Sequence, residues 1–279
     1  MKEKSLPVEV DHPIFIVGPH RSGTTLLYNM ASRHPDVGYF NIANRRFPSF
    51  PLLAHIITHF GMPDSPMESQ PIWDRFWNSE HDEMGANDAT PEAVLWYRKT
   101  VKRALKLRSA KRFLAKYPRL SLRLDWIDAV FPGALFVHII RDWRAVVNST
   151  LVRRHQRESK GGGWYGDRIP GWQEMGDLPP EIVAGRQYHY LTKTLERKET
   201  KYPDRFIKVY YTKLCLYPVE TIRYIADKCD LSWTEDFEKG IRRDLQSMNY
   251  KWRTQLDPSK IEKVRAEDPE FFARHEEPN

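Results

Sequence analysis

The sequence predicts an α/β fold in which helices flank a central parallel sheet in three layers. Short apolar segments of strand length alternate with longer amphipathic segments, and two of the apolar segments run directly into polar turns. Strands separated by helices form βαβ units, which gather ligand-binding groups at the carboxyl ends of the strands. No stretch between these segments has the composition of a linker, so we expect a single domain over residues 1–279.

Each element follows from its apolar pattern. The predicted strands are residues 14–17, 113–115, 135–140 and 206–210. The predicted helices are residues 24–33, 91–109, 145–154 and 181–201, where apolar residues recur at helical spacing. We expect further helices within 48–80 and 217–265, covering the ligand-binding edge of the sheet. Residues 160–180 contain three consecutive glycines and several prolines, which predicts a mobile loop.

The loop after the first strand, residues 18–25, has the layout of a phosphate-binding loop. Gly18 and Gly23 show the GxxxxG spacing of a P-loop, whose backbone N–H groups surround an anion at the N-terminus of the next helix. Thr24 stands where a nucleotide triphosphatase has its lysine, and Arg21 is the first long cation. The sequence therefore predicts a P-loop-type fold that binds a phosphate-like ligand other than ATP or GTP.

The third predicted strand also ends at a polar turn, after which a helical pattern begins. Arg141 ends the third predicted strand, and Ser149 follows eight positions later (149 − 141 = 8) on the next helix. An arginine can hold a phosphate through two parallel hydrogen bonds, and a hydroxyl about two helical turns further on lies on the same helix face.

These motifs resemble those of sulfotransferases that use 3′-phosphoadenosine 5′-phosphosulfate (PAPS), especially their bacterial and carbohydrate-directed branch. Residues 21–25, Arg-Ser-Gly-Thr-Thr, are similar to the family's 5′-phosphosulfate loop, and Arg141 with Ser149 to its 3′-phosphate pair. Residues 116–118, Lys-Tyr-Pro, resemble its lysine-x-proline passage. Tyr211 resembles a tyrosine beside the adenine, and residues 251–253 resemble a basic segment that closes over the cofactor.

The resemblance implies an enzyme that moves the sulfuryl group of PAPS in line to a hydroxyl or amine, without a metal. The implied cofactor-binding residues are Gly18, His20, Arg21, Ser22, Gly23, Thr24, Thr25, Arg141, Ser149, Tyr211 and Arg253. Sulfuryl transfer depends on positioning and electrostatic stabilisation. We therefore expect Arg21 to stabilise the leaving group and Lys116 to stabilise the developing charge.

The acceptor also needs a base, which the cofactor motifs do not contain. Residues 80–83, Glu-His-Asp-Glu, are the densest group of proton acceptors before the long helix at 91–109. A histidine beside a carboxylate is suited to take a proton near neutral pH. We predict that His81 is the base and that Glu83 orients or replaces it, with His20 as the rival.

The charge and the apolar content of the chain indicate which kinds of ligand and cellular surface it can contact. The formal net charge of +7 agrees with an anionic cofactor. Residues 98–112 are basic, but Leu and Val recur there at helical spacing, which favours a solvated helix face over a nucleic-acid patch. No segment has the ~18 apolar residues of a membrane span, and the first four residues lack the apolar core of a signal peptide, so we expect a cytoplasmic protein. Cys215 and Cys229 are expected to be buried thiols.

Two other function classes remain open. A P-loop kinase or NTPase-like phosphotransferase would share the fold, but it would place an acid for Mg²⁺ where this chain has Arg141. A non-catalytic module that binds a nucleotide or nucleic acid would need no base. Equilibrium binding of adenosine 3′,5′-bisphosphate (PAP) against ATP is the measurement that narrows these alternatives most. The acceptor is expected to be a small molecule or carbohydrate, with residues 160–180 as a lid over it.

Overall fold

The computed structural model describes residues 8–47, 51–61 and 63–277. In this part of the chain, five parallel strands form one sheet in the order β2-β3-β1-β4-β5. The strands are β1 (Ile14–Val17), β2 (Val37–Gly38), β3 (Arg112–Lys116), β4 (Leu135–Ile140) and β5 (Phe206–Tyr210). The four predicted strands are confirmed. The sequence does not predict β2, because two residues carry no periodic pattern.

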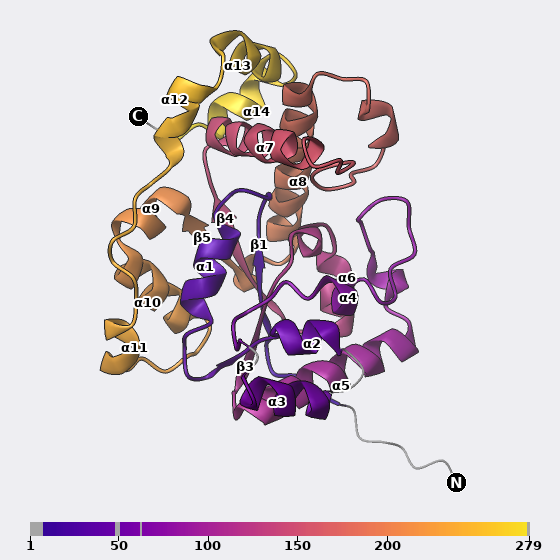
Figure 1. Ribbon diagram of the computed structural model, residues 1–279, viewed down its shortest axis with the longest axis vertical. Coiled ribbons are helices and arrows are strands. Elements are labelled where there is room, and N and C mark those ends of the chain that lie inside the picture. The colour runs from indigo at the N-terminus through magenta and orange to yellow at the C-terminus, as the bar shows by residue number, and fades with distance from the viewer. Residues whose placement is uncertain (1–7, 48–50, 62, 278–279) are drawn as a thin grey trace.

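Helices surround the sheet (Figure 1). They are α1 (Thr24–Ala31), α2 (Ile42–Arg46), α3 (Pro51–His59), α4 (Gln70–Trp73), α5 (Pro91–Arg108), α6 (Leu124–Val130), α7 (Trp143–Glu158), α8 (Pro180–Lys201), α9 (Tyr211–Leu216), α10 (Pro218–Lys228), α11 (Glu235–Lys239), α12 (Trp252–Gln255), α13 (Pro258–Arg265) and α14 (Pro269–Arg274). The four predicted helices correspond to α1, α5, α7 and α8. The predicted helix-rich segments contain α3, α4 and α10 to α13, although residues 48–50 and 62 lie outside the described residues.

Alternate side chains of the strands build two separate core layers, as the side-chain alternation of a strand requires. Phe15 and Val17 of β1 belong to the layer that contains α5 and α6, whereas Ile14 and Ile16 belong to the layer of α1 and α10. The sheet is therefore buried on both faces, which confirms the predicted three-layer arrangement. A third apolar cluster joins α7, α8, α13 and α14, at the upper end of the molecule in Figure 1.

The connection from β4 to α7 fixes where the second phosphate motif lies. Arg141 directly follows β4, and Asp142 caps α7 by accepting a hydrogen bond of 2.8 Å from the backbone N–H of Arg144. The first turns of α7 are anchored by buried residues such as Val146, which pack against α8 and α13. Ser149 therefore lies on a helix whose first turn is fixed next to the carboxyl end of β4.

Residues 160–180 form an irregular segment that is bonded to residues 80–82. The backbone N–H of Arg168 donates to Oδ2 of Asp82 at 2.8 Å, and the N–H of Asp82 donates to the carbonyl of Arg168 at 2.8 Å. The indole N–H of Trp172 donates to the carbonyl of Glu80 at 2.9 Å. These bonds give the segment a defined place, and its mobility stays a prediction.

Three expectations from composition can be compared with the structure. Helix α5 buries Val101 and Leu105 and exposes Lys102 and Arg103, as expected of an amphipathic surface helix. Cys215 and Cys229 are buried and free, as predicted. Among the described residues, none of the helices is both long and apolar enough to cross a membrane.

Candidate active site

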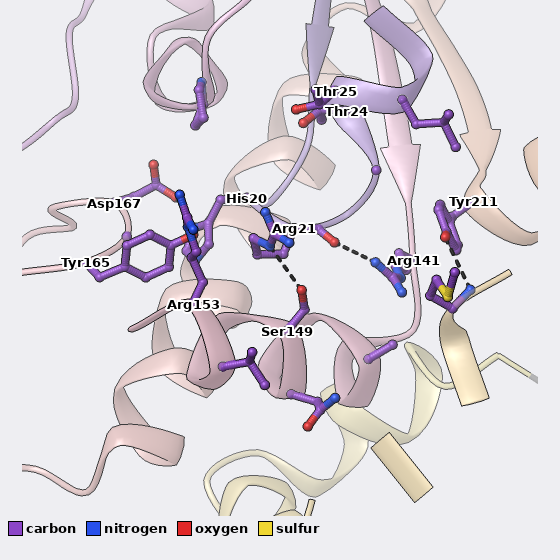
Figure 2. A pocket seen from close by; sticks show the side chains of 18 of the residues that line it. His20, Arg21, Thr24, Thr25, Arg141, Ser149, Arg153, Tyr165, Asp167 and Tyr211 are labelled. Carbon is purple, nitrogen blue, oxygen red and sulfur yellow. Dashed lines mark hydrogen bonds and ion pairs between the residues drawn. The ribbon is translucent and has the colours of Figure 1, made fainter. Parts of the chain in front are cut away.

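A pocket of about 870 Å³ lies where the carboxyl ends of β1, β3 and β4 meet the start of α7. Figure 2 shows the phosphate-binding loop on one side of it and α7 on the other. The predicted site residues that line it are His20, Arg21, Gly23, Thr24, Thr25, Lys116, Arg141, Ser149 and Tyr211. The structure thus brings both predicted phosphate motifs to one cavity.

The loop between β1 and α1 has a backbone shape that requires its glycines. Gly18 and Gly23 have φ angles of +148° and +105°. A Cβ at Gly18 would lie 2.8 Å from the carbonyl oxygen of Ile139, and one at Gly23 would lie 2.6 Å from the ring of Tyr211. Gly23 directly precedes α1, whose first N–H groups have no intrahelical acceptors. The loop can therefore present backbone donors to an anion, as predicted from the sequence.

Two predicted residues of this loop do not line the pocket. Ser22 is fully buried, and its hydroxyl donates to the carbonyl of Pro19 at 2.6 Å. The N–H of Gly18 donates to the hydroxyl of Ser121 at 3.0 Å. Ser22 and Gly18 therefore stabilise the loop conformation through hydrogen bonds and do not line the pocket.

Arg141 connects the loop to the rest of the pocket. Its guanidinium donates to the carbonyl of Arg21 at 2.8 Å and to Oδ1 of Asn249 at 2.7 Å, and it lies 4.1 Å from the ring centre of Tyr211. Arg141 is only 8% exposed, and burial lowers its pKa. Among the described residues, no carboxylate forms an ion pair with this guanidinium; the charge of Glu277, which accepts a hydrogen bond of 2.6 Å from Asn249, acts on it from further away. An unpaired buried charge is costly unless an anion accompanies it.

Arg21 and Ser149 meet across the pocket. Nε of Arg21 donates to the hydroxyl of Ser149 at 3.0 Å (Figure 2). The φ angle of Arg21 is +69°, an uncommon conformation for a residue with a side chain. The loop therefore directs this side chain toward α7 at a cost in backbone strain, of the kind found at functional sites.

Lys116 lies at the end of β3 on the same edge of the sheet. It is 4% exposed, and its ammonium group donates to the hydroxyl of Thr25 at 2.9 Å and to the carboxylate of Glu68. Thr25 is in the first turn of α1. The cation is thus fixed beside the phosphate-binding loop, as its position in the sequence predicts.

Tyr211 and the segment 248–255 border the pocket on the Arg141 side. The backbone N–H of Met248 donates to the hydroxyl of Tyr211 at 3.3 Å. From the basic segment 251–253, Lys251 lines the pocket, whereas the exposed Arg253 lies against the ring of Trp252 and is not part of the lining.

The predicted base and its partner, His81 and Glu83, do not line the pocket. Glu83 accepts a hydrogen bond of 2.6 Å from the hydroxyl of Tyr190, and burial together with this carboxylate raises the pKa of Tyr190 to about 12. Asp82 between them is fully buried, lies 3.1 Å from Nε of Arg119, and has a pKa raised by burial. In the structure, Glu83 is bonded to α8 through Tyr190, and Asp82 contacts Arg119 after β3.

The other histidine considered, His20, does line the pocket. Its Nδ1 lies 3.0 Å from Oδ2 of Asp167, which is 3% exposed. The sequence gives no signal for this pair, since the two residues are 147 positions apart (167 − 20 = 147). The pocket lining also includes charged residues that the sequence analysis does not assign to the site. They are Glu68, Arg153 and Arg157, together with Lys251 of the segment 251–253.

A model of the sulfotransferase family matches residues 13–235. A protein-tyrosine sulfotransferase of Drosophila melanogaster is 25% identical over 224 residues, and an omega-hydroxy-beta-dihydromenaquinone-9 sulfotransferase of Mycobacterium bovis is 28% identical over 273 residues. These alignments include 80% and 85% of this chain, which spans 38% and 68% of the two relatives.

Solved structures show the same fold. The sulfotransferase STF1 of Mycobacterium tuberculosis has a TM-score of 0.62 at 17% identity, with 96% of this chain and 78% of that chain covered. The sulfotransferase STF9 of Mycobacterium avium has a TM-score of 0.60 at 16% identity, with 96% and 77% covered.

Proposed function

The chain belongs to the sulfotransferase family, and from this premise we propose that it transfers the sulfuryl group of PAPS to a hydroxyl or amine of a small molecule or carbohydrate. PAPS is the donor substrate, and its sulfuryl group is activated by a phosphate leaving group. The protein binds and orients the two substrates for in-line transfer and stabilises the charge that moves between them. No catalytic metal is required in this proposal.

The buried charge of Arg141 is the observation that carries the proposal. Its guanidinium is 8% exposed and has an amide, a carbonyl and an aromatic ring as neighbours; among the described residues it has no ion-paired carboxylate, and Glu277 acts on its charge only from beyond Asn249. A phosphate would compensate this charge through two parallel hydrogen bonds. We assign Arg141 and Ser149 to the 3′-phosphate, the group that distinguishes PAPS from ordinary adenine nucleotides.

The phosphate-binding loop then receives the 5′-phosphosulfate. Gly18 and Gly23 give the loop its shape, and the N–H groups at the start of α1 face the anion. Arg21 stabilises the negative charge that grows on the leaving phosphate oxygen. Lys116, fixed beside Thr25, stabilises the oxygens of the sulfuryl group in transit.

Calorimetric binding of three nucleotides tests this assignment. We expect PAP to bind more tightly than ATP, with or without Mg²⁺. AMP differs from PAP only in lacking the 3′-phosphate, so it should bind at least about 30-fold more weakly, which corresponds to roughly 2 kcal/mol. Equal affinity for PAP and AMP, or tighter Mg²⁺-dependent binding of ATP, would favour a phosphotransferase instead.

A further inference from the structure

The half of the pocket that faces away from Arg141 contains a histidine–carboxylate pair. Figure 2 shows His20, Tyr165, Asp167 and Arg153 together on one side of Arg21, with Arg141 and Tyr211 on the other. If Arg141 binds the 3′-phosphate, as proposed above, this opposite half is where the acceptor enters. His20 directly precedes Arg21 in the loop, and both residues line the pocket.

Asp167 is held in a fixed place. The side-chain amide of Gln187 on α8 donates to the carbonyls of Asp167 at 2.9 Å and Tyr165 at 3.3 Å. Gly166 between them has a φ of +97°, and a Cβ there would lie 2.6 Å from the Gln187 side chain. The carboxylate of Asp167 is almost fully buried, and Nδ1 of His20 is 3.0 Å from it.

This geometry sets the tautomer of His20. A buried carboxylate accepts the proton of the nearer ring nitrogen, so the Nδ1–H form is favoured and the lone pair stays on Nε2. The ring of Tyr165 meets the imidazole edge-on, with 5.6 Å between ring centres, and restricts its rotation. The same carboxylate stabilises the imidazolium once a proton has been taken up.

The other proton acceptors near the pocket are less suited to this role. Glu68 is already engaged by the ammonium group of Lys116. Tyr165 would have to ionise before it acts as a base, and burial raises its pKa. His81 and Glu83 do not reach the pocket lining.

We propose that His20 is the catalytic base of the sulfuryl transfer and that Asp167 is the residue that positions it. The acceptor oxygen forms a bond to sulfur while its proton moves to Nε2 of His20. The bond from sulfur to the bridging oxygen breaks, and its electron pair stays on the 5′-phosphate of the departing PAP. The inference rests on the proposed function, because it requires PAPS as the donor.

The charges around His20 come from several elements. Arg21 lies on the same loop, Arg153 on α7, and Asp167 and Tyr165 on the irregular segment (Figure 2), while Glu68 is a further lining carboxylate. A general base acts only in its unprotonated form, so the rate of transfer should fall in acid. This acidic limb of the pH profile should disappear when His20 is replaced.

The kinetic test follows the label of ³⁵S-PAPS into free sulfate with water as acceptor and into phenyl sulfate with phenol, which keeps its proton at neutral pH, as acceptor. His20→Asn should lower turnover by about 10²–10⁴-fold, the usual contribution of a positioned base, while PAP binds as in the parent. Asp167→Asn should also lower turnover, and Asp167→Glu should restore part of it. His189→Asn is the matched control, since it removes a His–Asp pair of 2.9 Å outside the pocket.

Nitrogen NMR of the histidine rings gives a readout that does not depend on turnover. The resonances missing in His20→Asn identify His20, and they should show the Nδ1–H tautomer in the parent and its loss in Asp167→Asn. The opposite tautomer in the parent, or parent turnover in His20→Asn, would overturn the proposal even if PAP binds normally. Failure of the parent to bind PAP would instead overturn the assignment of the pocket.

Discussion

At the scale of single residues, Arg141 has the environment of a binding group rather than of a structural ion pair. Arg144, three positions later, shows the contrast, because it forms ion pairs with Asp142 at 2.6 Å and Glu276 at 2.9 Å. Both arginines are largely buried. This difference in their partners supports the proposal that Arg141 binds an anionic ligand.

Replacing Arg141 should therefore affect one part of the ligand selectively. We expect Arg141→Ala to weaken PAP binding by about 2–5 kcal/mol, because the phosphate loses a buried charged partner, and to change AMP binding much less. Calorimetry on both ligands measures this difference. Arg103→Ala on the exposed face of α5 controls for the lost charge. Equal losses for PAP and AMP would show that Arg141 only supports the loop through the carbonyl of Arg21.

Arg21 should behave differently, because the charge it stabilises grows during the reaction. We expect Arg21→Ala to lower kcat by about 10²–10³-fold, as for the loss of an oxyanion donor, with a smaller effect on PAP affinity. Turnover of PAPS and calorimetry of PAP on the same variant measure the two effects. Parallel losses would mean that Arg21 contributes ground-state binding only.

His138 provides a prediction about stability. It lies within β4, and burial lowers its pKa to about 3, with further contributions from Lys208 and His275. The unfolded chain binds this proton with an ordinary pKa near 6.5. The contribution of His138 to the free energy of unfolding is therefore complete above about pH 6.5. Below that pH it falls by up to about 1.4 kcal/mol per pH unit. Urea unfolding between pH 7 and 5 should show a shallower decline in His138→Leu than in the parent, whereas the exposed control His155→Gln should keep the parent slope.

At the scale of elements, the sequence predicts the parts of the site that follow strands. The sequence correctly predicts that Arg141 and Lys116 lie at the carboxyl edge of the sheet, because each stands at the end of an apolar segment and parallel strands share that edge. The pairing of His20 with Asp167 has no such local signal, since it depends on how an irregular segment settles against α8. The acidic neighbours of His81 suit it to act as a base, but the residue lies outside the pocket lining. Its carbonyl accepts a hydrogen bond from the indole N–H of Trp77.

The irregular segment itself can be tested through its glycines. Gly166→Ala should lower the free energy of unfolding by more than about 1 kcal/mol, because φ is +97° and the new Cβ would meet Gln187. It should also lower PAPS turnover by displacing Asp167. Gly163→Ala in the same segment is the control, since no atom lies within 4 Å of its Cβ position. Equal stability of the two variants in urea unfolding would contradict this account of the segment.

At the scale of the whole molecule, the lining of the pocket carries an excess of positive charge. The chain has a formal net charge of +7. The pocket lining alone contains seven Lys or Arg residues, namely Arg21, Lys116, Arg119, Arg141, Arg153, Arg157 and Lys251, and two carboxylates, Glu68 and Asp167. Arg153 and Arg157 lie one and two turns beyond Ser149 on α7, and in the described part of the chain neither has an ion-paired carboxylate.

This distribution predicts electrostatic steering of the donor substrate. The association rate of PAP should fall as salt is raised from about 0.02 to 0.5 M, because the Debye length shrinks from roughly 20 Å to 4 Å. Arg153→Gln with Arg157→Gln should lower the association rate several-fold at low salt and leave the dissociation rate nearly unchanged, since these residues lie beyond the groups assigned to the phosphates. Stopped-flow binding measures both rates. Lys102→Gln with Arg103→Gln on α5 removes the same net charge away from the pocket, so an equal effect of that pair would mean that total charge, and not its placement along α7, controls the encounter.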